Sequence, residues 1–284
     1  MRKICSLVAA LLFTLSAVAG ERNSFEAAVE TSKYQYREPH MEYPIKDSGR
    51  MKGVSAAFTH RSLLESYFGE NPAFVRIEGL YMQGKVDYDG YLQGGGMDGT
   101  PITEENIDDW YVDGRLLFGQ RYEFAEESLI LEPFMGLAYR FLRDNGHKNL
   151  DSGYLRESNY TYAPIGAHFT WNVTNTFRMM LKGEFDWLLE GKQKSEMSRF
   201  DPAFKDMKNT QKKGFGLRAG FRVEQDLGKI SLFAEPFYRY WKIQNSKHAC
   251  YYTEDIGGGW YWCYGGIEPY NTTREWGIKA GIEF

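Results

Sequence analysis

The stretch Trp276-Gly-Ile-Lys-Ala-Gly-Ile-Glu-Phe284 decides the fold, because polarity alternates along it with a period of two. One side carries Trp276, Ile278, Ala280, Ile282 and Phe284, and the other carries Gly277, Lys279, Gly281 and Glu283. Such alternation is typical of a β-strand with one apolar face and one polar face. The sequence therefore predicts a strand over 274–284 whose two faces meet different surroundings.

The N-terminal residues have the organisation of a secretory signal. Arg2 and Lys3 precede an apolar stretch from Leu7 to Ala17, and Ala17-Val18-Ala19 fits a small-x-small cleavage site. The alternative is a membrane anchor, but the apolar stretch is too short for a span of about 20 residues. We therefore expect a cleaved signal over 1–19 and a single mature domain over 20–284.

The composition of the chain narrows the fold classes. The formal net charge is -4, and it stays acidic without Arg2 and Lys3, so nucleic acid is not an expected partner. The part after the signal has no apolar run approaching 18 residues, which excludes helical membrane spans. Yet the chain holds 19 Phe, 20 Tyr and 7 Trp. Many aromatics among many charges suit a membrane β-barrel with aromatic girdles; a large soluble β-domain is the alternative.

Ten segments have the composition and periodicity of strands. We place them at 24–36, 51–61, 74–88, 110–122, 129–142, 159–171, 177–188, 214–224, 230–242 and 274–284. In the segment 177–188, for example, Phe177, Leu181 and Phe185 share one face, whereas Lys182 and Glu184 share the other. The registers of 24–36 and 230–242 are less regular.

The connections between these segments alternate in length. Those near 123–128, 172–176 and 225–229 are short, whereas the ones between them are long. The exception is Ser62 to Ala73, where we expect a helical turn around Leu63 to Phe68. Tight periplasmic turns and long external loops are typical of outer-membrane barrels. We therefore predict an all-β, ten-stranded antiparallel transmembrane β-barrel in the bacterial outer membrane, with both termini in the periplasm.

A closed sheet explains why charges recur at strand centres. In hydrocarbon, every backbone donor and acceptor must be satisfied inside the protein, and a closed barrel does so without an edge. Its interior can then hold ionic side chains away from lipid. Pro133, Pro164 and Pro236 fit less well, because proline removes a ladder donor. We expect bulges or strand ends near them.

Alternation predicts which charged residues face the lumen. They are Arg76, Glu78, Asp113, Arg115, Glu132, Arg140, Arg178, Lys182, Glu184, Asp186, Arg218, Arg222, Glu235 and Arg239, followed by Lys279 and Glu283 in the last strand. Eight strands leave an interior just filled by side chains, whereas sixteen or more leave a channel. We therefore expect mainly a structural network of salt bridges, with a narrow polar conduit or a catalytic cluster as alternatives.

The ten-strand count also invites comparison with the omptin proteases. Those enzymes carry paired acids and an Asp-x-His pair at the external rim of a ten-stranded barrel. Asp87-Tyr88-Asp89 is similar to the acidic half, but none of the histidines His40, His60, His147, His168 and His248 has an Asp two residues before it. Hydrolysis would lack its usual proton acceptor. We expect no catalytic residues, and interpret Asp87 and Asp89 as a solvated strand end.

The last long loop contains two cysteines and many aromatics. Cys250 and Cys263 are the only cysteines after the signal, and in an oxidising compartment they are expected to form a disulfide. A metal site with His248 is the alternative, although the spacing matches no familiar zinc pattern. The loop also contains the candidate binding residues Tyr251, Tyr252, Trp260, Tyr261 and Trp262, together with Tyr264. These either contact an external partner, or cover the barrel mouth or join the outer aromatic belt.

Three strings resemble a family of single-domain bacterial outer-membrane β-barrels without an assigned activity. They are Arg156 to Gly166 (RESNYTYAPIG), Gly183 to Lys192 (GEFDWLLEGK) and Glu268 to Thr273 (EPYNTT). The closing strand, with Trp276, Ile278, Ala280, Ile282 and Phe284, is similar to the terminal strand that the barrel-assembly machinery reads in such proteins. The resemblance implies fold and location, and no catalytic residues.

These observations favour a non-enzymatic surface or structural barrel. We expect contact with outer-membrane lipid, recognition by the assembly machinery and an unidentified external ligand for the long loops. No cofactor and no metal are expected. A narrow porin-like channel is the first alternative, and a rim-located omptin-like hydrolase is the second.

Overall fold

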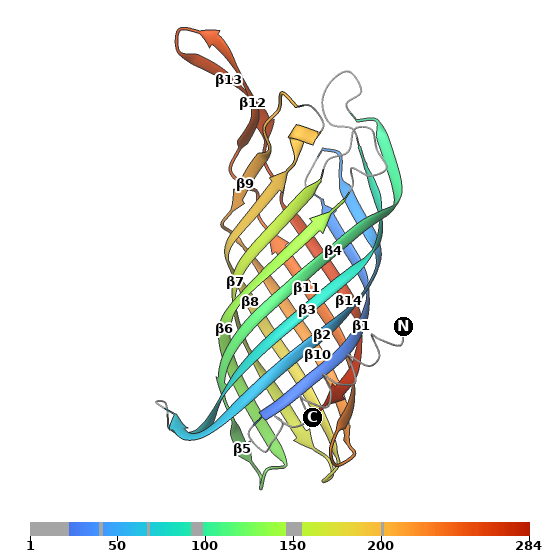
Figure 1. Ribbon diagram of the computed structural model, residues 1–284, viewed down its shortest axis with the longest axis vertical. Helices are drawn as coiled ribbons and strands as arrows, with labels where there is room; N and C mark the ends of the chain where they lie inside the picture. Colours follow the sequence, from blue (N-terminus) through green and yellow to red (C-terminus); the bar gives the residue numbers. More distant parts are fainter. Residues whose placement is uncertain (1–22, 40–41, 67–68, 92–98, 146–154, 200–201) are drawn as a thin grey trace, which may run out of the picture.

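The computed structural model describes residues 23–39, 42–66, 69–91, 99–145, 155–199 and 202–284, which form one closed β-barrel (Figure 1). The wall consists of β1 (Asn23–Glu38), β2 (Ile45–Ser66), β3 (Gly69–Tyr91), β4 (Pro101–Gln120), β6 (Leu129–Asp144), β7 (Arg156–Asn172), β8 (Phe177–Ser195), β10 (Gly214–Asp226), β11 (Ser231–Ile243) and β14 (Asn271–Glu283). The predicted fold class and strand count are confirmed. The expected signal at 1–19 lies outside the described residues.

Four smaller strands complete the sheet structure. β5 (Tyr122–Phe124) pairs with β6, and β9 (Met207–Gln211) pairs with β8, so both extend the wall. β12 (Ala249–Gly257) and β13 (Trp260–Gly266) form a separate hairpin. The short 3-10 helix η3 (Met197–Arg199) precedes β9. No helix in the described part of the chain is long and apolar enough to span a membrane.

The barrel closes between the first and last strands. β1 pairs antiparallel with β2 on one side and with β14 on the other, so Val29 faces both Val54 and Ala280. Phe284 continues this closure, because its backbone N–H donates to the Phe25 carbonyl at 2.9 Å. The wall therefore has no free edge, as a sheet in hydrocarbon requires.

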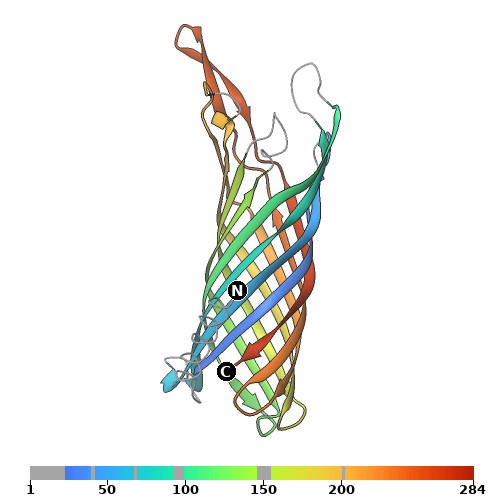
Figure 2. The ribbon, with the colours of Figure 1, turned by 45° about the vertical axis from the view of Figure 1, so that its right-hand side comes forward.

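The two ends of the barrel differ (Figure 2). One end, called here the turn end, carries the short connections at 125–128, 173–176 and 227–230. The opposite loop end carries the long connections, and the β12–β13 hairpin projects beyond it (Figures 1 and 2). The second connection does not follow the prediction of a long link with a helical turn. β2 continues to Ser66, and register shifts at Ser62/Glu65 and Glu65/Ser66 break the alternation that marks a strand in the sequence.

The outer surface carries an apolar belt. Its exposed side chains include Val29, Val54, Ile77, Leu116, Met135, Leu137, Ile165, Phe169, Leu181, Phe185, Leu217, Phe221, Leu232 and Ile278. A water-soluble protein rarely exposes so large a continuous apolar surface. The belt is instead the surface that a transmembrane barrel presents to lipid acyl chains.

Inside the barrel, apolar clusters lie among the polar side chains. One contains Tyr34, Met51, Met82, Val86, Ile107 and Tyr111. A second contains Ala138, Tyr162, Leu188, Trp241 and Ile243, and a third contains Phe74, Leu117 and Phe134. These side chains fill space that an open pore would leave to water.

The three prolines interrupt ladders in different ways. Pro133 stands opposite the break between β4 and β5, which matches the expected strand end. Near Pro164, pairing with β6 lapses and the β7–β8 register shifts between Thr161 and Tyr162. At Pro236 the expected bulge is absent: pairing with β10 lapses between Gly220 and Val223, but the register is the same on both sides. The missing N–H there removes a bond without bending the strand.

Candidate functional site

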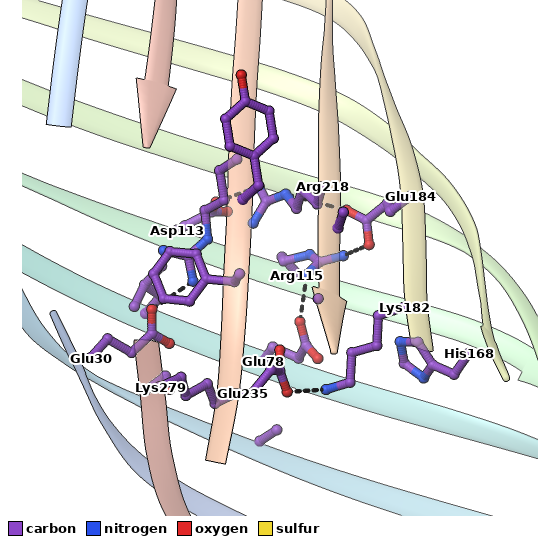
Figure 3. A pocket seen from close by; sticks show the side chains of 18 of the residues that line it. Glu30, Glu78, Asp113, Arg115, His168, Lys182, Glu184, Arg218, Glu235 and Lys279 are labelled. Atoms are coloured by element: carbon purple, nitrogen blue, oxygen red, sulfur yellow. Dashed lines mark hydrogen bonds and ion pairs between the residues drawn. The ribbon is translucent and has the colours of Figure 1, made fainter. Parts of the chain in front are cut away.

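The centre of the lumen is an ionic network around Arg218 and Arg115, called here the middle layer (Figure 3). Arg218 Nε donates to Asp186 Oδ2 at 2.8 Å, and its Nη2 donates to Asp113 Oδ2 at 2.7 Å. Arg115 binds Glu78 at 2.7 Å and also pairs with Glu184. These charges come from β3, β4, β8 and β10, so the network ties distant parts of the wall together.

A tyrosine completes the middle layer. The Tyr162 hydroxyl donates to Asp113 Oδ1 at 2.7 Å and accepts from Arg218 Nη2 at 2.6 Å. Asp186 has no measurable exposure and Asp113 is 3% exposed, so these carboxylates are shielded from bulk water. Buried charges of this kind are tolerated only when they are paired and hydrogen-bonded.

A second group of charges, the turn-end layer, lies nearer the short turns. Glu26 accepts from Arg76 at 3.2 Å and from Arg222 at 2.6 Å, and it also pairs with Lys279. Arg222 reaches Glu283 at 2.7 Å. This layer joins β1 and β14 to strands across the lumen, so it braces the closure of the barrel.

A third group, the loop-end layer, lies on the opposite side of the middle layer. Arg239 pairs with Glu30 at 2.6 Å and with Glu275 at 3.3 Å. The Tyr111 and Ser32 hydroxyls both donate to Glu275 at 2.7 Å. The three layers thus repeat one chemistry along the barrel axis: a guanidinium bridging acids from different strands.

Glu268 lies close to the rim, in the connection before β14. It accepts from Arg156 at 2.8 Å and from the Tyr36 hydroxyl at 3.3 Å, and it is 5% exposed. Burial raises the pKa of this carboxyl to about 7; Arg156 opposes the shift and Glu38 adds to it. Glu268 can therefore change its charge near neutral pH.

Small cavities lie among these side chains, and two of them border the ionic layers. The first has a volume of about 100 Å³ and is bordered by both middle-layer arginines (Figure 3). The second, of about 110 Å³, lies among turn-end residues such as Arg76 and Arg222. His168 and Lys182 border both cavities. Polar cavities of this size hold a few water molecules, whereas a porin lumen is an open aqueous channel.

The structure places the predicted lumen residues on the inner side of the wall. Besides those above, Lys182 pairs with Glu235 at 2.6 Å, Glu132 lies 3.5 Å from Arg121, and Arg178 pairs with Glu224. Arg140 differs from them. It has no ion pair with a described residue, and its guanidinium lies 4.1 Å from the centre of the Tyr111 ring. A cation over an aromatic face is still an attractive contact.

Several lumen residues were missed in the sequence. Glu26 and Glu30 lie in the first strand, whose register we left open, and Glu275 lies in the last strand. The signal was present in β1, where Ser24, Glu26, Ala28, Glu30 and Ser32 occupy every second position and are all buried. Alternation in the segment 159–171 placed Tyr162 and His168 on the polar face, opposite Ala163 and Ile165. Tyr111 gave no comparable signal, because aromatic residues occur on both faces of the wall.

The β12–β13 hairpin carries the predicted disulfide. Cys250 and Cys263 are joined by an S–S bond of 2.01 Å. The hairpin turn consists of Gly257, Gly258 and Gly259, all with positive φ, a backbone region open mainly to glycine. The disulfide cross-links the two strands of the hairpin, and the glycines allow the tight reversal at its tip.

The predicted aromatic binding residues fall into two groups. Trp260, Tyr261 and Trp262 are near the hairpin tip and are 74%, 64% and 59% exposed. Tyr251 and Tyr252 are near the base, where their rings lie 4.9 and 6.1 Å from that of Phe204. The hairpin projects away from the barrel in both ribbon views, so the tip lies neither over the mouth nor in the apolar belt (Figures 1 and 2).

One set of side chains could approach a metal ion. His248 Nδ1 lies 3.6 Å from Cys263 Sγ, and the donor atoms of His248, Cys250 and Cys263 all lie within 4.8 Å of one another. The two sulfurs are bonded to each other, so neither is a thiolate, the form in which cysteine binds metals. The oxidised hairpin therefore offers a single imidazole.

The acids considered for a hydrolase lie on the outer face of the barrel. Asp87 accepts from the backbone N–H of Asn106 at 3.0 Å, and Asp89 pairs with Lys46 at 3.6 Å. Both side chains are exposed, whereas the neighbouring inward position Val86 is buried. Of the described histidines, His168 lies in the lumen, His60 bonds Asn23 and His248 lies at the hairpin base. His40 and His147 lie outside the described residues.

The predicted assembly-signal residues lie on β14 and at its end. Trp276 and Ile278 are 45% and 48% exposed on the outer face, and Ala280 is also exposed. Ile282 and Phe284 are half-buried near the turn end. Their contacts show how the barrel closes; recognition by assembly machinery stays a prediction.

Comparison with known proteins gives a fold and no family. No protein-family model and no curated protein sequence matches the chain. Among solved structures, the outer membrane protease OmpT of Escherichia coli is similar, with a TM-score of 0.61, 10% identity and coverage of 93% of this chain and 96% of that one. Ail, the attachment invasion locus protein of Yersinia pestis, has a TM-score of 0.31 at 8% identity, and the match covers 93% of this chain and 99% of that one. OprG of Pseudomonas aeruginosa has a TM-score of 0.36 at 10% identity, and the match covers 92% of this chain and 95% of that one.

The likeness to OmpT shows a shared barrel fold. The apolar belt, the closed wall and the ionic lumen give the same conclusion from the chain's own residues. The protein is a bacterial outer-membrane β-barrel whose belt contacts lipid, and the predicted location is confirmed.

Proposed function

We propose that this barrel is a non-enzymatic surface protein that binds an external partner through the β12–β13 hairpin. The supporting observation is the exposed aromatic tip with Trp260, Tyr261 and Trp262 on a disulfide-stapled hairpin. Large aromatic side chains contribute strongly to recognition of proteins and sugars, because they bury much surface with few rotatable bonds. A hairpin cross-linked by a disulfide loses less conformational entropy on binding than one without the cross-link.

The filled lumen and the outward acids agree with a binding role. The ionic layers and apolar clusters occupy much of the lumen, which favours an anchoring barrel over a wide channel. Asp87 and Asp89 face away from the lumen, where they contact Asn106 and Lys46. The barrel then serves as a rigid anchor, and the hairpin carries the contact surface.

The test is a double substitution at the tip. The refolded mature protein and its Trp260→Ala/Trp262→Ala variant are compared for binding to host cells, extracellular-matrix proteins and a glycan array. The control is Leu227→Ala, which removes an exposed apolar side chain at the turn end. We expect the double variant to lose at least tenfold in affinity, as for two aromatic hot-spot residues, and the control to bind normally. Unchanged binding by the double variant would contradict the proposal.

A narrow polar conduit is the second candidate. The observation in its favour is the pair of polar cavities that share His168 and Lys182. It predicts discrete conductance steps in planar bilayers, which Gly220→Phe should abolish by filling the first cavity beside Glu235. Bilayers that remain silent with correctly folded protein would remove this candidate.

A further inference from the structure

The outer face of β14, β1 and β2 carries a group of unpaired cations. Lys33, Arg50, Lys52 and Arg274, called here the basic patch, are all exposed. None of the four makes an ion pair with another residue in the part of the chain that the structure describes. The patch is therefore an uncompensated concentration of positive charge on one side of the barrel.

The strand register brings these cations close together. Lys33 stands directly opposite Arg50, and Arg50 stands directly opposite Lys85 on the next strand. Directly opposite residues have Cβ atoms about 4.5 to 5.5 Å apart, and like charges there destabilise a sheet. Lys85 is neutralised by Asp108, but Lys33 and Arg50 have no such partner among the described residues. An anion from outside the chain would remove this repulsion.

On the opposite side of the barrel, three outward cations each have an acidic partner. Arg143 lies 3.8 Å from Glu157, Lys192 lies 2.6 Å from Glu190, and Lys194 lies 2.8 Å from Glu196. Each of these cations has an acid of its own. Lys208 on β9 makes no ion pair with a described residue either, but Lys194, which stands directly opposite it, is paired with Glu196. What distinguishes the basic patch is that Lys33 and Arg50 are directly opposed and that neither has an acid among the described residues.

The basic patch borders the apolar belt. Along β2, the outward position after Lys52 is Val54, which is 56% exposed; along β14, the outward position after Arg274 is Trp276. Lys33 stands directly opposite Trp276 on the neighbouring strand. Exposed tryptophans mark the level of lipid headgroups, and cations next to them extend into the polar layer. The charges therefore lie where phosphates of the outer leaflet would be.

We propose that the basic patch binds the phosphate groups of an outer-leaflet phosphoglycolipid of the lipid A class. Guanidinium and ammonium groups donate charge-assisted hydrogen bonds to phosphate oxygens, and Arg50 can do so through two nitrogens. The acyl chains of the same lipid lie along Val54, Val29 and Trp276. This inference rests on the barrel surface alone and is independent of the hairpin.

Its test uses two matched variants of the refolded mature protein. Lys33→Gln/Arg50→Gln removes two charges from the patch, and Arg143→Gln/Lys192→Gln removes two from the opposite side. The probe is bis-phosphorylated lipid A in mixed micelles, with the dephosphorylated lipid as a second probe. We expect the patch variant to bind lipid A about tenfold to thirtyfold more weakly, and the control variant to change less than twofold. Heat-dependent gel mobility verifies folding of both.

Three outcomes would overturn the proposal. An equal loss of lipid A affinity in both variants would mean that binding depends only on the net charge of the protein. Equal affinity for the dephosphorylated lipid would mean that the contact is hydrophobic. Full competition by millimolar inorganic phosphate would mean a simple anion site in place of a lipid site.

Discussion

Arg218 illustrates how much of this barrel depends on single lumen residues. It bridges Asp113 and Asp186, which come from different strands and are almost fully buried. Replacing Arg218 with Met leaves both carboxylates without their cation. Removing one partner from a buried ion pair typically costs about 3 to 5 kcal/mol. We expect a matching decrease in the free energy of unfolding, measured in urea by tryptophan fluorescence in micelles.

The control for this substitution is Lys229→Met, in the exposed turn before β11. It introduces the same residue and removes one positive charge where water screens the loss. An Arg218 variant that unfolds at the same urea concentration as this control would show that the middle layer does not stabilise the barrel.

The buried carboxyl of Glu268 is expected to make the free energy of unfolding depend on pH. Burial raises its pKa to about 7, against an ordinary value of 4.5, so the folded state favours the protonated form. This stabilisation is fully present below about pH 4.5 and is lost as the pH rises through 7, with a total of about 3 kcal/mol. We expect Glu268→Gln to lose less unfolding free energy than the unmodified protein between pH 5 and pH 8. Equal losses would contradict the assignment.

For single residues, the sequence predicts which face of the strand a side chain lies on better than it predicts which residue that side chain contacts. Alternation placed Asp113 and Arg218 on the inner face, because a strand has only two faces. It could not pair them, since they are 105 positions apart and meet only through the tilt and stagger of the closed wall. Arg140 shows the same limit: its position is inward, but its partner is an aromatic ring.

Among the elements, the β12–β13 hairpin depends most on one bond. Replacing Cys250 and Cys263 with Ser removes a cross-link that is worth about 3 kcal/mol for a loop of this length in the chain-entropy model. At its base, Tyr251 accepts from Lys205 N and Gly266 accepts from Asn209, whereas the aromatic side chains at its tip are exposed. We expect limited proteolysis to cut the variant within 249–266, while the barrel strands stay intact. Identical cleavage of the unmodified protein would show that the bridge does not order the hairpin.

The elements that the sequence missed share a physical reason. The ten wall strands separate lipid from a polar interior, so their residues alternate and were found. β12 and β13 have water on both faces, and nothing imposes alternation on them. The C-terminal end of β2 was not predicted for a related reason, because register shifts interrupt its period of two. Pattern therefore reveals strands only where their two faces meet different environments.

For the molecule as a whole, two opposite surfaces explain the architecture. The outside carries an apolar belt, and the inside carries three ionic layers with apolar clusters among them. Exchanging the residues of the outer and inner faces would place charged side chains in hydrocarbon, which costs several kcal/mol per group. The proposed roles of the hairpin and of the basic patch both depend on this arrangement, because it fixes which parts of the chain stand above the membrane.

The most direct test follows nitroxide spin labels at single cysteines placed successively at positions 27 to 32 of β1 in lipid vesicles. The account predicts high oxygen accessibility at Ala27, Val29 and Thr31, which face the membrane, and low accessibility at Ala28, Glu30 and Ser32, which face the filled lumen. Accessibility that peaks at the even positions, or that does not alternate, would contradict the transmembrane barrel itself.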